Sequence, residues 1–297
     1  MKPITVFTPT YNRANLLQRL YKKMQAQTDK NFIWLIVDDG STDNTCEVVN
    51  SLLSNTAIEI QYLYKQNGGK QSAVNAALEA CQTEWFAFCD SDDWYLDNTI
   101  EKMNLMCKNI ESSNTVSGIV ARRGDENLQC KFFPLIKEKE MVIDLPTLYE
   151  KYKFHAETCA VFRTSSLREA KYPVIADRFI PESYMFDKYS QKYKVIFINE
   201  VWSISKYLPD GLTAQSNKLY HNNPLGVMYA LIQATRTQYG FKRNVKNLIS
   251  LFCWRKMYPQ ICTEETPLIR WECVLFAVSG YIFARLTKQP SWIWKKD

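Results

Sequence analysis

An acidic cluster, Asp90-Ser91-Asp92-Asp93, follows directly on the apolar run from Trp85 to Cys89. The run is typical of a buried strand, so three carboxylates are predicted to stand where a strand ends. Like charges this close repel one another, and a divalent cation with oxygen ligands removes that cost. Because Mg²⁺ commonly takes one or two protein carboxylates together with substrate phosphates, the cluster indicates a metal site for a diphosphate ligand. The alternative is an acidic loop in which Asp92 or Asp93 caps a helix.

A second acidic turn, Asp38-Asp39-Gly40-Ser41-Thr42-Asp43, follows the strand-like run from Phe32 to Val37. A carboxylate at this point can accept hydrogen bonds from a nucleobase N–H or from ribose hydroxyls. Gly40 would permit the tight turn. Ser41 or Thr42 could cap the next helix, and the alternative is that the whole turn is helix-capping chemistry.

Three further side chains have types that suit a nucleotide. Tyr11 follows Pro9 and Thr10 and could stack on a nucleobase, although a core tyrosine is equally common. Arg13 and Lys70 are the nearest cations for a diphosphate, and the alternative for both is a solvated side chain.

The elements that must position these residues are short apolar runs, each followed by apolar residues at helical spacing. The runs are Ile4–Phe7, Phe32–Val37, Ile58–Leu63 and Trp85–Cys89. Four strand-then-helix units predict a mostly parallel sheet covered by helices on both faces. In such sheets ligands bind beyond the carboxyl ends of the strands, where residues 9–13, 38–39, 70 and 90–93 all fall.

The second half of the chain gives weaker signals. Asp97 is predicted to cap a helix, Val116–Ala121 to form a strand, and Arg122–Glu140 to be charged and irregular. The remaining expected elements are helices near 145–152 and 165, a strand at 195–198 and helices from 223 onward. The apolar stretch from Cys273 to Phe283 is shorter than the roughly 20 residues of a membrane span.

Composition indicates a packed protein, since 46% of the 297 residues are hydrophobic and 13% are aromatic. The nine cysteines form no Cys-x-x-Cys pair, and with only two histidines, His155 and His221, a zinc site is not expected. Both histidines are interpreted as structural in preference to facing an acceptor. The odd cysteine count and the absence of a leader before the first strand predict reduced thiols in a cytoplasmic protein.

The charge of +6 is uneven, because residues 217–297 hold 12 of the 37 Lys and Arg residues but only 4 of the 31 acidic ones. The same segment contains Trp254, Trp271, Trp292 and Trp294. This asymmetry suggests an anionic partner, either a membrane surface or a phosphate-bearing substrate, and the alternative is a solvated helical face. No nucleic-acid-binding module is recognisable, so a nucleic-acid partner is not expected.

The motifs occur in one order along the chain. They are Thr8-Pro9-Thr10-Tyr11-Asn12-Arg13, Val37 to Asp43, Asn67-Gly68-Gly69-Lys70 with Asn75, and Asp90 to Asp93. This order resembles the family 2 glycosyltransferases, which have the Rossmann-like α/β fold called GT-A. The resemblance is most specific over residues 1–110 and extends with weaker motifs to about residue 225.

The resemblance implies an inverting, metal-assisted transfer of a sugar from a nucleoside diphosphate donor, expected to be a UDP-sugar. The acceptor would be a hydroxyl of a glycan or of a polyprenyl-diphosphate-linked sugar in polysaccharide synthesis. The residues that the resemblance assigns to the nucleotide-sugar are Pro9, Tyr11, Arg13, Asp39, Lys70, Asp90, Ser91 and Asp92. Asp92 and Asp93 would hold the metal, Mn²⁺ or Mg²⁺.

The resemblance also implies a general base that deprotonates the acceptor. Phe179–Tyr184 matches the family segment that carries it, so Glu182 is the predicted base. Ser183 stands where a second acid is common in the family, and Asp177 and Asp187 are rival candidates. A surface glutamate with no catalytic role is the alternative.

The predicted organisation is a GT-A catalytic domain over residues 1–216 and a basic helical C-terminal extension over 217–297. The catalytic domain would comprise a nucleotide-sugar half, 1–110, and an acceptor half, 111–216. We expect a cytoplasmic hexosyltransferase with peripheral contact at the inner face of the membrane. The alternatives are a catalytically degenerate nucleotide-sugar-binding or assembly subunit and a nucleotidyltransferase, whose glycine-rich basic loop is missing after the first strand.

Overall fold

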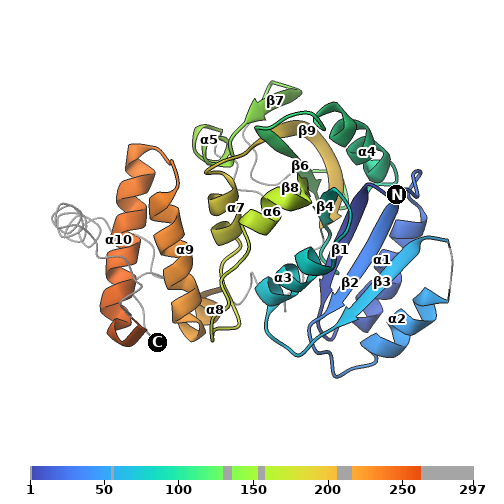
Figure 1. The fold of residues 1–297 in the computed structure, drawn as a ribbon, viewed down its shortest axis with the longest axis horizontal. Coiled ribbons are helices and arrows are strands. Elements are labelled where there is room, and N and C mark those ends of the chain that lie inside the picture. The colour runs from blue at the N-terminus through green and yellow to red at the C-terminus, as the bar shows by residue number, and fades with distance from the viewer. Residues whose placement is uncertain (1, 55–56, 130–135, 153–157, 206–215, 262–297) are drawn as a thin grey trace. The chain divides into compact units, whose positions relative to one another are not determined.

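The computed structural model describes residues 2–54, 57–129, 136–152, 158–205 and 216–261 (Figure 1). The chain divides into two compact units. Unit 1 comprises Met1–Lys171 and Lys192–Leu208, and unit 2 comprises Tyr172–Gln191 and Pro209–Asp297. The functional division expected at residue 216 stays a prediction.

Unit 1 contains the strands and six of the helices in the described part of the chain. Its strands are β1 (Ile4–Thr10), β2 (Phe32–Asp38), β3 (Glu59–Tyr64), β4 (Trp85–Phe88), β5 (Asp93–Tyr95), β6 (Val116–Gly124), β7 (Glu140–Ile143), β8 (Thr158–Arg163) and β9 (Lys194–Ser205). Its helices are α1 (Ala14–Gln25), α2 (Thr45–Leu53), α3 (Lys70–Ala80), α4 (Thr99–Asn109), α5 (Leu145–Lys151) and α6 (Thr164–Glu169).

Within the described residues the strands form one nine-stranded sheet in the order β3-β2-β1-β4-β8-β6-β9-β5, and β7 pairs with β9. Strands β1 to β4 are mutually parallel, as the repeated strand-then-helix pattern predicts. Beyond β4 the sheet is mixed, because β8 runs antiparallel to both β4 and β6. The long strand β9 pairs parallel to β6 and antiparallel to β5 and β7.

Helices cover both faces of this sheet (Figure 1). On one face, alternate residues such as Val6 and Trp34 join a buried cluster with α1, α2 and α4. The intervening residues Phe7, Leu35 and Val37 are also buried, and they point to the opposite face. Burial on both faces explains why these strands are continuous apolar runs in the sequence.

Two local expectations are wrong. Asp97 does not cap α4, because the residue that immediately precedes this helix is Asn98, whose side chain makes no capping hydrogen bond. The Asp97 backbone carbonyl accepts from the Thr28 backbone N–H. Arg122 and Arg123 belong to β6, which continues to Gly124, so the irregular segment begins later than predicted. An arginine can remain in this strand because Arg123 meets a carboxylate, as described below.

Unit 2 contains the remaining described helices, α7 (Ser183–Tyr189), α8 (Ser216–Asn222), α9 (Pro224–Arg236), α10 (Phe241–Met257) and the 3₁₀ turn Pro259–Ile261. Helices α9 and α10 lie side by side (Figure 1) and share an apolar cluster that includes Met228, Leu251 and Trp254. Among the described helices, none combines the length and apolar character needed to cross a bilayer.

Trp254 is 1% exposed, and its indole N–H donates to the Pro224 carbonyl at 2.8 Å. It stacks on His221, whose Nδ1 lies 2.5 Å from the Tyr258 hydroxyl. Trp254 is therefore a core residue of unit 2 and no membrane anchor, and His221 has a structural environment. Trp271, Trp292, Trp294 and His155 lie outside the described residues.

Candidate functional site

The loops that carry the predicted nucleotide residues follow three neighbouring parallel strands of unit 1. Strand β1 lies between β2 and β4, and its last residue, Thr10, is paired with Asp38 at the end of β2. The Asp39 N–H donates to the Thr10 carbonyl at 2.9 Å, and the Cys89 N–H donates to the Phe7 carbonyl at the same distance. The residues that follow these strands therefore start from one edge of the sheet, which is the usual ligand edge of a parallel sheet.

The acidic cluster after β4 brings three carboxylates together. One oxygen from each of Asp90, Asp92 and Asp93 lies within 4.8 Å of the others. Lys70, the first residue of α3, places its ammonium 2.9 Å from Asp90 Oδ2, and Arg123 on β6 places a guanidinium nitrogen 2.6 Å from Asp93 Oδ2. These pairs leave the cluster with a charge of about −1.

Asp92 differs from its two neighbours. Its backbone carbonyl accepts from the Arg19 guanidinium at 2.6 Å, but its carboxylate has no hydrogen-bond or ion-pair partner among the described residues. It is half-buried beside two carboxylates that are already paired. Hard oxygen donors in this number suit Mn²⁺ or Mg²⁺, so the residues present fit such an ion, with Asp92 as the carboxylate most available to it.

Neighbouring charges and burial shift the pKa values of Asp90 and of the adjacent Cys89. Burial opposes ionisation of Asp90, but the charges of Lys70 and Arg123 outweigh it and hold the pKa of this carboxyl below its usual value. The pKa of the Cys89 thiol is raised well above its usual value, chiefly by burial and further by the charge of Asp93. The Asp90 carboxylate thus stays ionised at neutral pH, and the adjacent Cys89 thiol stays protonated.

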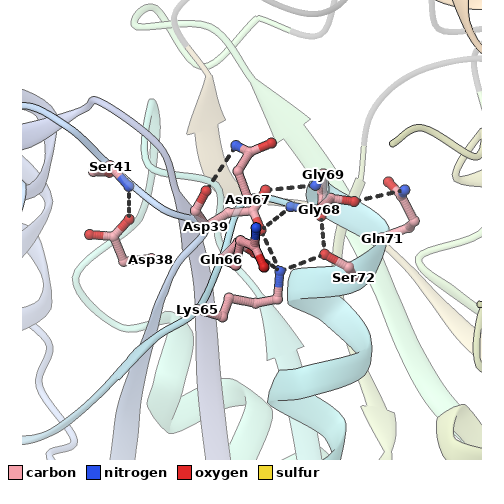
Figure 2. A network of polar contacts seen from close by, with 10 residues as sticks. All are labelled: Asp38, Asp39, Ser41, Lys65, Gln66, Asn67, Gly68, Gly69, Gln71 and Ser72. Carbon is pink, nitrogen blue, oxygen red and sulfur yellow. Dashed lines mark hydrogen bonds and ion pairs between the residues drawn. The ribbon is translucent and has the colours of Figure 1, made fainter. Parts of the chain in front are cut away.

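The carboxylate of Asp39 lies in a dense polar network at the loop between β3 and α3 (Figure 2). It accepts the N–H groups of Gly68 at 3.0 Å and Gly69 at 2.7 Å, and the ammonium of Lys65 at 2.7 Å. Asp39 is 4% exposed. The neighbouring Asp38 is also buried and accepts from the Ser41 N–H at 2.8 Å and from the Tyr62 hydroxyl.

The loop after β1 is held by the turn after β2. Asn12 has a φ of +53°, a left-handed conformation that asparagine tolerates better than most residues. Its side-chain oxygen accepts from the Thr42 N–H at 2.7 Å, and its own N–H donates to Ser41 Oγ at 2.8 Å. Tyr11 is 48% exposed, which is a suitable state for stacking on a ligand.

The expectation that Ser41 or Thr42 caps the next helix is wrong, since the residue before α2 is Asn44 and neither of them caps the helix. Asp43 Oδ1 accepts from the Thr45 N–H at 3.0 Å instead. Gly40 has a φ of +82°, as the predicted tight turn requires. The other predicted residues of unit 1 occupy β1 and the loops beside it: Pro9 and Arg13 are half-buried, and Ser91 is buried.

Unit 2 carries the predicted base. Glu182 is exposed at the start of α7, and its charge adds to burial in raising the pKa of Tyr220. The two rival candidates for the base have other environments than Glu182. Asp177 Oδ2 accepts the Gly226 N–H at 2.9 Å, and Asp187 is 4% exposed and hydrogen-bonded by the Tyr239 hydroxyl. Burial raises the pKa of Asp187 to about 6.

Sequence reasoning missed Lys65 and Arg123, which neutralise Asp39 and Asp93. The signal for Arg123 was its place at the end of a strand-like run, where a charged side chain needs a partner. Lys65 gave no such signal, because it lies in a polar loop after an exposed strand.

These features together define an α/β protein of the GT-A architecture with an acidic cluster at one edge of its sheet. The model of the family described as Glycosyl transferase family 2 matches residues 5–170. The chain belongs to this family.

Curated relatives match about a third of the chain. An uncharacterized glycosyltransferase of Rickettsia conorii is 34% identical over 113 residues, which are 38% of this chain and 18% of that protein. The chondroitin synthase of Pasteurella multocida is 37% identical over 98 residues, 33% of this chain and 10% of that protein. The chain therefore matches only a minor part of the length of these relatives.

Solved structures share the fold at low sequence identity. Staphylococcus aureus TarS 1–349 in complex with UDP-GlcNAc has a TM-score of 0.62 at 16% identity, covering 95% of this chain and 81% of that one. The mannosyltransferase PcManGT of Pyrobaculum calidifontis, in complex with GDP-Man and Mn²⁺, has a TM-score of 0.57 at 15% identity, covering 98% and 84%.

Proposed function

We propose that this protein is an inverting glycosyltransferase that moves a sugar from a nucleoside diphosphate, expected to be UDP, to a hydroxyl group of a glycan or a lipid-linked glycan. The observation that carries the proposal is the gathering of Asp90, Asp92 and Asp93 within 4.8 Å at the ligand edge of a parallel sheet. Membership of family 2 supports a sugar transfer in preference to other nucleotide chemistry. The intact cluster argues against a degenerate binding subunit.

The nucleotide would lie along the ends of β1, β2 and β4. Tyr11 would stack on the base, Asp39 would lie at the base end, and Lys70 and Arg13 would face the diphosphate. The UDP-GlcNAc complex of TarS supports a uracil donor, and the GDP-Man complex of PcManGT requires that guanine donors be tested as well. Pro9, Asp90 and Ser91 would border the ribose and the sugar.

Asp92 and Asp93 would hold Mn²⁺ or Mg²⁺, which supplies positive charge to the departing diphosphate when bound. In unit 2, the Glu182 carboxylate would take the proton of the acceptor hydroxyl. The acceptor oxygen would then form a bond to the anomeric carbon as the bond from that carbon to the diphosphate oxygen breaks. The electron pair leaves with the nucleoside diphosphate, and the anomeric configuration inverts.

The test compares donor binding with transfer. Asp92→Ala is expected to lose the Mn²⁺-dependent part of UDP-sugar binding, whereas Glu182→Gln is expected to keep donor binding and to lose transfer by at least about 100-fold. Asp177→Asn is the matched control, since its amide oxygen can still accept from Gly226. Transfer at the wild-type rate by Glu182→Gln would show that another group is the base, and a wild-type chain that binds no nucleotide-sugar would refute the function.

We also propose that the protein acts in the cytoplasm and contacts the inner face of the membrane peripherally. A polyprenyl-diphosphate-linked acceptor would be found at that face. The support is the basic character of α10, whose charged residues are all lysine or arginine: Lys242, Arg243, Lys246, Arg255 and Lys256. Co-sedimentation with vesicles containing anionic lipid, compared with neutral vesicles, measures this contact. Equal recovery on both vesicle types would refute an electrostatic contact.

A further inference from the structure

Lys65 follows β3 directly, and its backbone N–H donates to the Asp38 carbonyl at 2.9 Å, continuing the pairing with β2. Its ammonium reaches three oxygens in the network of Figure 2: Asp39 Oδ1 at 2.7 Å, Ser72 Oγ at 2.8 Å and the Gln66 carbonyl at 2.6 Å. A lysine ammonium has three donors, so all of them are used within the protein.

These hydrogen bonds link the end of β2 to the first turn of α3. Asp39 lies just after β2, whereas Ser72 lies in the first turn of α3, and Ser72 Oγ also donates to the Gly69 carbonyl at 2.9 Å. Lys65 is the counter-charge of the buried Asp39 carboxylate. A buried carboxylate is costly without such a partner, so the contact is expected to be maintained.

The backbone of the loop between the end of β3 and the start of α3 has little conformational freedom. Gly69 has a φ of +86°, a conformation open chiefly to glycine. A Cβ added at Gly68 would lie 2.6 Å from Ser72 Oγ and 3.1 Å from the Lys65 ammonium. The Gly68 backbone therefore lies directly against the Lys65–Ser72 contact, two residues before the first residue of α3, Lys70.

Lys70 is the residue that pairs with Asp90 at 2.9 Å. The contacts thus form a continuous chain from Asp39, through Lys65 and the Gly68–Gly69 loop, to Lys70 and the acidic cluster. We propose that Lys65 is a positioning residue of the nucleotide site: it fixes this loop and so sets where Lys70 presents its charge. The inference rests on the proposed function only in taking a nucleoside diphosphate as the ligand near Lys70.

A double-mutant cycle on UDP binding tests this inference. The dissociation constant is measured by calorimetry with Mn²⁺ for the wild type, Lys65→Met, Lys70→Met and the double variant. Each single variant is expected to bind UDP about tenfold more weakly. If Lys65 acts through Lys70, the double variant binds within about twofold of Lys70→Met, because the two changes are not independent.

Fully additive losses would overturn the inference, since they would mean that Lys65 contacts the nucleotide on its own. Lys102→Met is the matched control, because it removes an exposed lysine that pairs with Glu200 at 2.8 Å elsewhere in unit 1, and it is expected to bind UDP like the wild type. Thermal denaturation checks that each variant folds. If Lys65→Met does not fold, Ser72→Ala takes its place in the same cycle.

The failure of this inference differs from the failure of the proposed function. A wild-type chain that binds neither UDP nor another nucleoside diphosphate refutes the function. A wild-type chain that binds UDP, with Lys65→Met and Ser72→Ala binding equally well, refutes only the positioning role.

Discussion

Replacement of Arg123 by methionine tests the electrostatic description of the acidic cluster. The side chains of Arg123 and Asp93 are 14% and 6% exposed, with 2.6 Å between nitrogen and oxygen. Removing one partner of a buried ion pair leaves an uncompensated charge and typically costs about 3–5 kcal/mol. We expect Arg123→Met to lower the free energy of unfolding by this amount, measured by urea denaturation.

The same substitution changes the charge of the cluster from about −1 to about −2, because Lys70 then remains as its paired cation. A divalent cation should therefore bind the variant more tightly than the wild type. An ion at about 100 times its dissociation constant stabilises a folded protein by about 2.7 kcal/mol. We expect MnCl₂ to raise the urea midpoint of Arg123→Met more than that of the wild type.

The control is Lys171→Met, which removes an ion pair with Glu79 whose side chains are 29% and 70% exposed. Such exposed pairs contribute about 0–1 kcal/mol, so this variant should resemble the wild type with and without Mn²⁺. The reasoning is refuted if Arg123→Met is as stable as the control, or if Mn²⁺ stabilises Arg123→Met no more than the wild type.

Two further changes test unit 2. Gly226→Ala would place a Cβ 2.0 Å from the Phe179 carbonyl oxygen. Alanine usually stabilises a helix relative to glycine, but this overlap should outweigh that gain and lower the free energy of unfolding by about 1–3 kcal/mol, measured by urea denaturation. An unchanged urea midpoint would contradict this packing. Asp187 has a pKa raised to about 6, chiefly by burial, so the folded form binds its proton more tightly than the unfolded chain. Protonated Asp187 therefore adds up to about 3 kcal/mol to the free energy of unfolding below about pH 4, and this contribution is lost as the pH rises through 6. Asp187→Asn should remove that part of the pH dependence, and an identical pH profile for the variant would refute the assignment.

The parallel part of the sheet is predictable from the sequence because its signals are local. Strands β1, β2 and β4 are buried on both faces, so each appears as a continuous apolar run followed by amphipathic helical spacing. Strand ends then follow from polar residues and glycine, which is why the two acidic turns are located correctly. Gly40, with a positive φ, confirms the expected turn.

The mixed part of the sheet is less predictable, because its pairings join distant segments. Strand β8 lies between β4 and β6, and β9 pairs with three strands, none of which adjoins it in the sequence. Likewise, the charge partners Lys65 and Arg123 are chosen by tertiary contacts, and no periodicity in the sequence marks them. The predicted helix cap at Asp97 fails by one position, since Asn98 is the residue before α4.

The left-handed Asn12 has a consequence for the motions of unit 1. Two amide hydrogens of the β2–α2 turn, those of Thr42 and Asp43, are donated to a single oxygen on the β1–α1 loop. Exchange of either hydrogen with solvent deuterium requires its separation from the Asn12 side chain. We therefore expect hydrogen exchange of Thr42 and Asp43 to be coupled through this one side chain, so that ordering one loop also favours order in the other.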